Sequence, residues 1–159
     1  AMRRGEKRTL RWGISNKERD MYREQLRTLG LGLENRMSSK VGLLSGGQRQ
    51  ALTLLMATIK QPKLLLLDEH TAALDPKTAK NVLTLTQKII AENHLTAMMV
   101  THNMKDALEY GNRTIMMHEG KIILDIDAET KKRIHVEDLL VMFEKASGSE
   151  INNDRMLLG

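Results

Sequence analysis

Three short stretches of this 159-residue sequence combine residue types that could bind or cleave a phosphate compound. The first runs from Ser45 through Gly46 and Gly47 to Gln48, where a loop is predicted to turn into a helix. A serine hydroxyl, two glycines that permit close backbone approach and the free N–H groups of a helix N-terminus together favour phosphate binding. A plain capped helix start explains the same residues, because Ser-Gly-Gly is a common turn composition.

The second stretch is the acidic pair Asp68 and Glu69, which follows the apolar run at residues 64–67. Carboxylates at the C-terminal end of a buried strand lie where open α/β sheets bind ligands. Asp68 would hold magnesium, directly or through water, and Glu69 would orient or deprotonate an attacking water. The alternative is a strand that simply ends in acids facing solvent.

The third stretch is Thr101 followed by His102, directly after the next predicted strand. A histidine at this position could hydrogen-bond a terminal phosphate or the attacking water. A lone histidine at a strand end often has no such role. The other four histidines (His70, His94, His118 and His135) do not have the spacing of a metal-ligand motif.

Hydrophobic periodicity and capping residues predict the elements that must position these residues. The predicted helices cover residues 17–29, 46–60, 76–92, 103–110 and 135–146, and the predicted strands cover residues 64–67, 96–101, 113–118 and 121–126. The unbroken apolar run at 64–67 favours a strand buried on both faces. The alternation of helices and strands predicts an α/β core with parallel strands, and a hairpin that turns at Glu119 and Gly120 adds an antiparallel edge.

Composition narrows the classes of protein to which the chain can belong. Hydrophobic residues make up 41% and charged residues 28%, which is typical of a folded globular domain. The sequence contains no cysteine, so disulfides, thiol nucleophiles and thiolate metal sites are excluded. No apolar run approaches the roughly 18 residues of a membrane-spanning helix. No short apolar segment after a basic start resembles a signal peptide, so we expect a cytosolic chain.

The net charge of +5 is unevenly distributed. Residues 1–40 hold 11 Lys or Arg against 5 Asp or Glu, and the remaining residues hold 14 against 15. Aromatic residues make up only 3%, which leaves few rings for stacking on bases. We therefore interpret the basic segment as a solvated helical face and expect no nucleic-acid partner.

The order and spacing of these stretches resemble those of the ATP-binding cassette (ABC) ATPases. Residues 44–50 are similar to the signature motif, 64–69 to the Walker B strand, 71–75 to the D-loop, and 100–102 to the switch-histidine region. The resemblance spans residues 16–126. It implies a P-loop NTPase-like α/β fold, with a helical subdomain beside a parallel-sheet core that ends in a hairpin and a helix.

The resemblance also implies a role for each site residue. Asp68 would contact magnesium-bound water, Glu69 would be the catalytic base, and His102 would contact the γ-phosphate of ATP. Ser45, Gly46, Gly47 and Gln48 would face the nucleotide of the opposite subunit in a head-to-tail homodimer. Asp75 would lie at the same interface, so that ATP and Mg²⁺ are bound at shared sites.

The sequence departs from the family pattern in two ways. The position after the Walker B glutamate, commonly proline in the family, is His70, and neither a Gly-x-x-x-x-Gly-Lys-[Ser/Thr] phosphate loop nor a glutamine loop is found. The resemblance therefore implies the C-terminal part of a nucleotide-binding domain, present as a fragment. Residues 1–44 would belong to the helical subdomain, 45–146 to the rest of the domain, and 147–159 to a tail.

By resemblance, the full-length protein is the ATP-hydrolysing subunit of an ABC transporter. An importer of small solutes fits best, with permease subunits as partners that hold it at the inner face of the cell membrane. We expect the fragment to be inactive without its Walker A part. Two alternatives stay open: a soluble ABC ATPase that acts on nucleic acid or ribosomes, and a non-catalytic interaction module.

Overall fold

The computed structural model describes residues 15–147. The chain divides into two compact units, and the boundary falls between Met98 and Met99. The first unit carries the signature-like and acidic stretches, and the second carries His102. The first fourteen residues and residues 148–159 of the predicted tail lie outside the described residues, and Ser147, predicted as the start of the tail, is instead the last residue of a helix.

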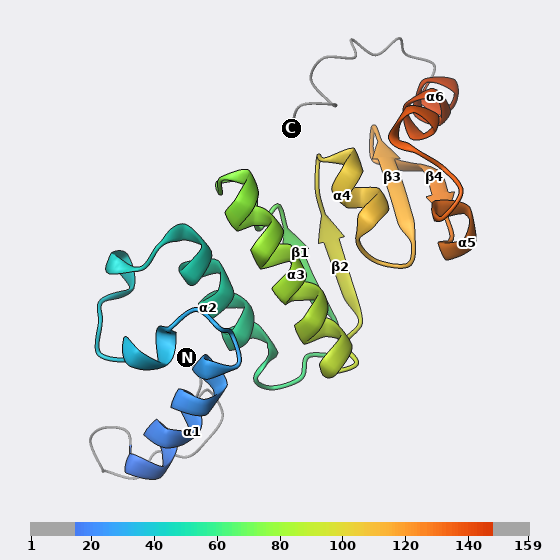
Figure 1. The fold of residues 1–159 in the computed structure, drawn as a ribbon. Coiled ribbons are helices and arrows are strands. Elements are labelled where there is room, and N and C mark those ends of the chain that lie inside the picture. The colour runs from blue at the N-terminus through green and yellow to red at the C-terminus, as the bar shows by residue number, and fades with distance from the viewer. Residues whose placement is uncertain (1–14, 148–159) are drawn as a thin grey trace. The chain divides into compact units, whose positions relative to one another are not determined.

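The first unit is built mainly from helices, with one complete strand (Figure 1). In chain order its elements are α1 (Asn16–Arg27), η1 (Leu33–Asn35), η2 (Val41–Leu43), α2 (Gly46–Thr58), β1 (Leu65–Asp68) and α3 (Pro76–Glu92), and strand β2 (Ala97–Val100) follows across the boundary. All of these helices and strands except the two short 3₁₀ helices were predicted from the sequence, with bounds shifted by a few residues.

Strands β1 and β2 are hydrogen-bonded neighbours. The Leu65 N–H donates to the Thr96 carbonyl at 2.9 Å. This bond joins the beginning of one strand to the beginning of the other, so the two strands run in the same direction. The predicted parallel pair connected by helix α3 is therefore confirmed.

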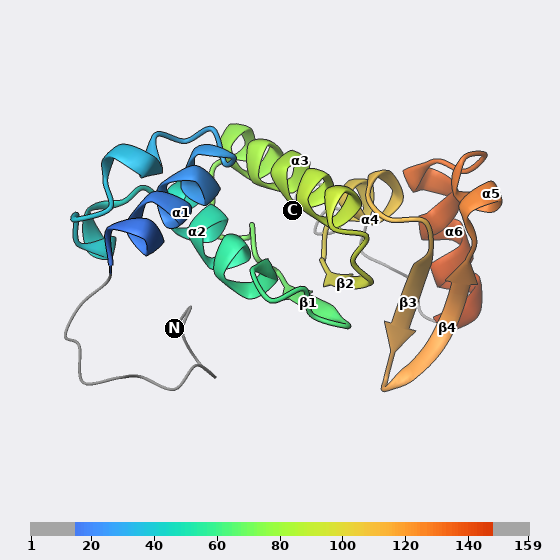
Figure 2. The same ribbon diagram turned by 90° about the horizontal axis from the view of Figure 1, so that it is seen from below.

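Local signals explain where the helices of the first unit begin. Helix α1 starts with a capping box between Ser15 and Glu18, and α3 starts with Asp75 as N-cap and Pro76 in its first turn. Helices α2 and α3 pack side by side (Figures 1 and 2). The core of the first unit consists mainly of Leu26, Leu29, Leu33, Leu44, Ala51, Leu54, Leu55, Leu65, Leu67, Val82, Leu83 and Ile89.

The prediction that strand β1 is buried on both faces is wrong for the described residues. Leu65 and Leu67 are buried, whereas Leu66 between them is 66% exposed and Leu64 is 50% exposed. Side chains alternate between the two faces of a strand, so one face packs into the core and the other stays open. An apolar run alone does not distinguish a strand covered on two faces from one covered on a single face.

The second unit contains a hairpin packed against a helix (Figure 2). Its elements are α4 (Met104–Glu109), β3 (Thr114–His118), β4 (Lys121–Ile126), α5 (Ala128–Lys131) and α6 (Val136–Ser147). Strands β3 and β4 pair antiparallel, as predicted, and the two turn residues Glu119 and Gly120 both have positive φ (47° and 76°). Met104, Ile126, Leu139 and Leu140 form its core.

The short helix α5 was not predicted from the sequence. Among residues 15–147, no helix is both long enough and apolar enough to span a membrane.

Candidate functional site

Ser45 is the N-cap of helix α2. Its Oγ accepts a hydrogen bond from the Gln48 N–H at 3.2 Å, and the Gln48 Oε1 accepts one from the Ser45 N–H at 3.1 Å. This reciprocal pair is a capping box. Ser45 is exposed, so its hydroxyl and the helix N-terminus face solvent. The capped helix start is therefore present. The Ser45 oxygen acts as the acceptor in the cap, so its hydroxyl proton can still be donated to an anion.

The Gln48 side chain is also held from outside helix α2. Its Nε2 donates to the Leu31 carbonyl at 3.1 Å, and Arg36 Nη1 donates to its Oε1 at 3.4 Å. Sequence reasoning missed Leu31 and Arg36, because they lie 17 and 12 residues away and no local pattern marks them. These contacts fix the Gln48 amide and through it the Ser45 cap.

Gly46 and Gly47 lie against the segment that leads into helix α3. A Cβ at Gly46 would come within 2.7 Å of Leu74 Cδ2, and a Cβ at Gly47 within 2.5 Å of Thr78 Cγ2. Real Cβ atoms essentially never approach that closely, so a side chain at either position would force a neighbour to shift. The structure thus brings the signature-like stretch next to the turn that carries Asp75.

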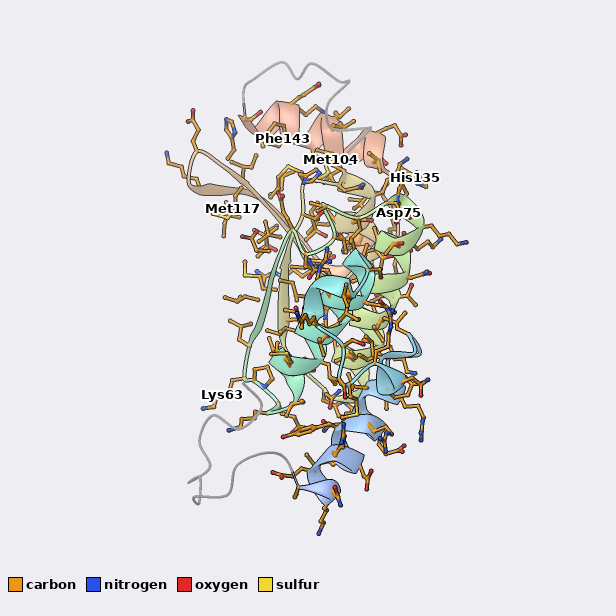
Figure 3. All side chains as sticks on the ribbon, turned by 90° about the vertical axis from the view of Figure 1, so that its left-hand side faces the viewer. Lys63, Asp75, Met104, Met117, His135 and Phe143 are labelled. Atoms are coloured by element: carbon orange, nitrogen blue, oxygen red, sulfur yellow. The ribbon has the colours of Figure 1, made fainter. Side chains whose placement is uncertain are left out.

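The acidic pair lies at the end of strand β1. Asp68 is the last residue of the strand, Glu69 follows with φ of 40°, and both are exposed. Two hydrogen-bonded turns follow, from Ala72 N–H to the Glu69 carbonyl and from Leu74 N–H to the Thr71 carbonyl, both at 3.0 Å. In Figure 3, Lys63, which precedes β1, and Asp75, at the start of α3, are well separated from each other.

His70 is half-buried between these turns and helix α3. Its Nε2 lies 3.2 Å from the hydroxyl of Thr86, which itself donates to the Val82 carbonyl at 2.8 Å. The single hydroxyl proton of Thr86 is used on Val82, so the His70 ring must be the donor and its Nε2 must carry hydrogen. Burial lowers the pKa of the His70 imidazole.

Asp75 caps helix α3. Its carboxylate accepts a hydrogen bond from the Thr78 N–H at 3.1 Å. Hydrogen bonding to Thr78 holds the pKa of this exposed carboxyl below its usual value. Asp75 is therefore ionised near neutral pH and places a negative charge at the N-terminus of α3, where the helix dipole favours it.

His102 belongs to the second unit and is exposed. The next residue, Asn103, caps α4 by accepting from the N–H groups of Lys105 and Asp106 at 2.9 and 3.2 Å. Burial raises the pKa of Asp106, nearby Glu109 raises it further, and nearby His102 lowers it. Among residues 15–147 no group of three or more Asp, Glu or His side chains could hold a metal ion.

Comparison with known proteins identifies the family. A family model described as "ABC transporter" matches residues 4–72. A "Tyrosine transport ATP-binding protein" of Clostridioides difficile (strain R20291) is 51% identical over 121 residues, which cover 76% of this chain and 48% of that protein. The chain belongs to the ABC transporter family. A "Methionine import ATP-binding protein" of Clostridium tetani is 40% identical over 119 residues, covering 69% of this chain and 37% of that protein.

The solved structure of an ATP-binding cassette of an ABC transporter, in its ADP conformation, has the same fold. It matches with a TM-score of 0.66 at 23% sequence identity and covers 88% of this chain and 54% of that chain. This likeness confirms the expected α/β fold of ABC ATPases. The chain spans about half the length of the curated ABC relatives that it matches.

Proposed function

We propose that this chain is the part of an ABC importer's ATP-hydrolysing subunit that carries the signature motif, Walker B strand, D-loop and switch histidine. In the full-length subunit, ATP hydrolysis would drive uptake of a small solute, for which amino acids are the favoured class. The proposal is supported by the names of the relatives, which include proteins of tyrosine transport and of methionine import.

One observation carries the proposal: the exposed Ser45 hydroxyl lies at the N-terminus of a 13-residue helix whose first residues are glycines packed against the segment before Asp75. A helix N-terminus attracts anions through its free N–H groups and its dipole. Ser45, Gly46 and Gly47 are proposed to face the nucleotide of a second subunit. Gln48 joins them and, through its bonds to Leu31 and Arg36, holds the Ser45 cap in place.

The remaining residues are proposed to act where the terminal phosphate of ATP is hydrolysed. Glu69 would accept the proton of the attacking water as general base, and His102 would hydrogen-bond the terminal phosphate. Asp68 fits Mg²⁺, because this ion typically takes one or two carboxylates and completes its shell with water and phosphate oxygens. When bound, Mg²⁺ would neutralise negative charge on the phosphates.

The proposed assembly is a dimer in which two copies of the chain share each ATP. We propose a head-to-tail homodimer in which Ser45 of one copy and Glu69 of the other serve the same ATP, with Asp75 at the shared interface. Membrane permease subunits would hold the dimer at the inner face of the cell membrane. Closure on ATP and opening after hydrolysis would then move the permease.

Glu69→Gln in the full-length subunit tests the assignment of the base. The amide keeps the size of the side chain and its hydrogen bonds but cannot accept the proton, so turnover should fall about 10²- to 10⁴-fold. ATP still binds, and the variant should accumulate as a nucleotide-trapped dimer in size-exclusion chromatography. Normal turnover in this variant would refute Glu69 as the base.

Ser45→Arg tests the contact between subunits. The bulky side chain at the start of α2 should block closure, so this variant should be inactive and stay monomeric with ATP. Ser39→Arg is the matched control, because Ser39 is also exposed but lies before the motif. Trapped dimers in the Ser45→Arg variant would contradict the cross-subunit role of Ser45, and so would an equal loss of ATP hydrolysis in the Ser39→Arg control.

A further inference from the structure

His70 is the side chain that connects the acidic pair to helix α3. The residue follows Glu69 directly, and its ring N–H donates to the hydroxyl of Thr86, in the middle of α3, at 3.2 Å. Thr86 is 3% exposed, so this bond is shielded from water on the Thr86 side. A bond between a loop residue and a buried helix position fixes the loop more firmly than one at the surface.

Glu69 has a backbone conformation that needs such support. Its φ of 40° lies in the left-handed region, which residues other than glycine and asparagine rarely adopt because the Cβ atom approaches the following carbonyl oxygen. Such conformations persist where the surrounding structure holds them. Here Glu69 is held by strand β1 before it, by the turn from its carbonyl to the Ala72 N–H, and by His70 after it.

We propose that His70 is a positioning residue for the Glu69 carboxylate, which its hydrogen bond to Thr86 keeps in the orientation needed for catalysis. The inference rests on the proposed function of Glu69 as the base. His70 acts only through the backbone of its neighbour and is not assigned a contact with substrate or metal. Thr86 serves as the fixed acceptor, since its own proton is committed to the Val82 carbonyl.

Four variants of the full-length subunit test the pair. His70→Leu removes the donor, and Thr86→Val removes the acceptor with almost no change of shape. Each should lower kcat for ATP hydrolysis about 10- to 100-fold, because small misplacements of a catalytic group have effects of this size. KM for ATP should change less than about threefold. His70→Gln, which offers an amide N–H at a similar reach, should restore kcat to within about threefold of the wild type.

The fourth variant combines His70→Leu with Thr86→Val. Since both single changes remove the same hydrogen bond, between His70 and Thr86, the double variant should be about as slow as either single variant. Additive losses would overturn the proposal, as would unchanged kcat in both single variants or a His70→Gln variant as slow as His70→Leu. If His70→Leu fails to fold, Thr86→Val and His70→Gln decide the outcome, with thermal unfolding midpoints reported for each.

Thr58→Val is the matched control. Thr58 is buried on helix α2 (5% exposed) and donates to the Leu54 carbonyl at 2.9 Å, as Thr86 does to Val82. Its hydroxyl also lies 3.2 Å from the Leu55 carbonyl, and both of these acceptors belong to α2 itself. Its kcat should stay within about threefold of the wild type, and an equal loss there would overturn the proposal. Glu69→Gln distinguishes a failure of the proposed base from a failure of the proposed positioning residue. Normal turnover in Glu69→Gln would refute Glu69 as the base. If Glu69→Gln loses turnover but His70→Leu keeps it, only the role of His70 is refuted.

Discussion

Gly46 and Gly47, at the start of helix α2, are constrained by different neighbours. The atom that blocks a side chain at Gly46 is Leu74 Cδ2, the far end of a flexible side chain. The atom that blocks one at Gly47 is Thr78 Cγ2, on a short β-branched side chain in the first turn of α3. Leucine can rotate away, but threonine is stiff at χ1. The two glycines therefore differ in how well they tolerate substitution.

Gly47→Ala should lower the free energy of unfolding by about 1–3 kcal/mol, as overpacking of a buried contact does. Gly46→Ala should lower it less. Urea unfolding of the chain measures both values, and Gly42→Ala is the control because a Cβ there meets no atom within 4 Å. Thr78→Ser removes the blocking methyl, so adding it to Gly47→Ala should recover most of the loss. Equal effects at positions 42 and 47 would contradict the steric argument.

Asp75 makes the stability of the chain depend on pH. Hydrogen bonding to Thr78 lowers the folded-state pKa of this carboxyl, so the unfolded chain binds more protons at low pH. The stability from the cap is present above about pH 4, the ordinary range of Asp, and is lost as pH falls through the folded-state pKa. Asp75→Asn keeps an oxygen at the N-cap but does not titrate. The loss of stability between pH 6 and pH 3, from urea unfolding, should be smaller in this variant; equal losses would contradict the prediction.

At the scale of elements, helix α4 is short and needs support at both ends. A six-residue helix is marginal by itself. Asn103 caps its start, directly after His102. At its other end the buried Lys131 amine donates to the carbonyls of Ala107, Tyr110 and Gly111 at 2.8, 2.7 and 3.3 Å. A cation at a helix C-terminus satisfies carbonyls that have no partner within the helix and favours the helix dipole.

Lys131→Met should loosen α4 while leaving the hairpin in place. Loss of hydrogen bonds to a charged donor costs about 1.5–3 kcal/mol, which corresponds to about 10- to 150-fold faster opening of the helix. Native-state hydrogen exchange of the α4 amides measures this opening. Lys132→Met is the control, because Lys132 is exposed and pairs only with exposed Glu129 in the contacts described. Equal exchange rates in the two variants would rule out a capping role for Lys131.

At the scale of the whole molecule, one face of strand β1 is apolar and open. Leu64 and Leu66 are 50% and 66% exposed. Contiguous exposed apolar surface favours association, and strand residues are prone to pair with another chain. We therefore expect the 159-residue chain to associate with itself in solution.

Leu66→Lys should weaken this association, because a charge in the apolar face must be desolvated when the face is covered. Light scattering across a range of concentrations should show a dimer or larger species for the wild type and a smaller mean mass for the variant. Gln87→Lys adds the same charge at an exposed polar position of α3 and should leave the mass unchanged. A wild-type chain that stays an 18.1 kDa monomer would contradict the prediction.

Much of the local structure was predictable from the sequence, because it depends on residues a few positions apart. The caps at Ser45, Asp75 and Asn103 each bond to N–H groups two or three residues onward. The hairpin reverses direction at Glu119 and Gly120, as predicted. Helix faces were predicted less well. On α2, helical periodicity predicts one apolar stripe of Ala51, Leu52, Leu55, Met56 and Ile59. Met56 is nevertheless 42% exposed, and Leu54, which lies outside this stripe, is buried.

The contacts that hold the site together were decided only by the tertiary structure. Gln48 bonds to Leu31 across 17 residues, His70 to Thr86 across 16, and Lys131 to Ala107 across 24. No periodicity or cap signal reports such pairs, because they depend on how helices and loops pack once each has formed. Burial of strand β1 on one face has the same origin: the side chains of the run are apolar throughout, and only the placement of neighbouring elements determines which of them water reaches.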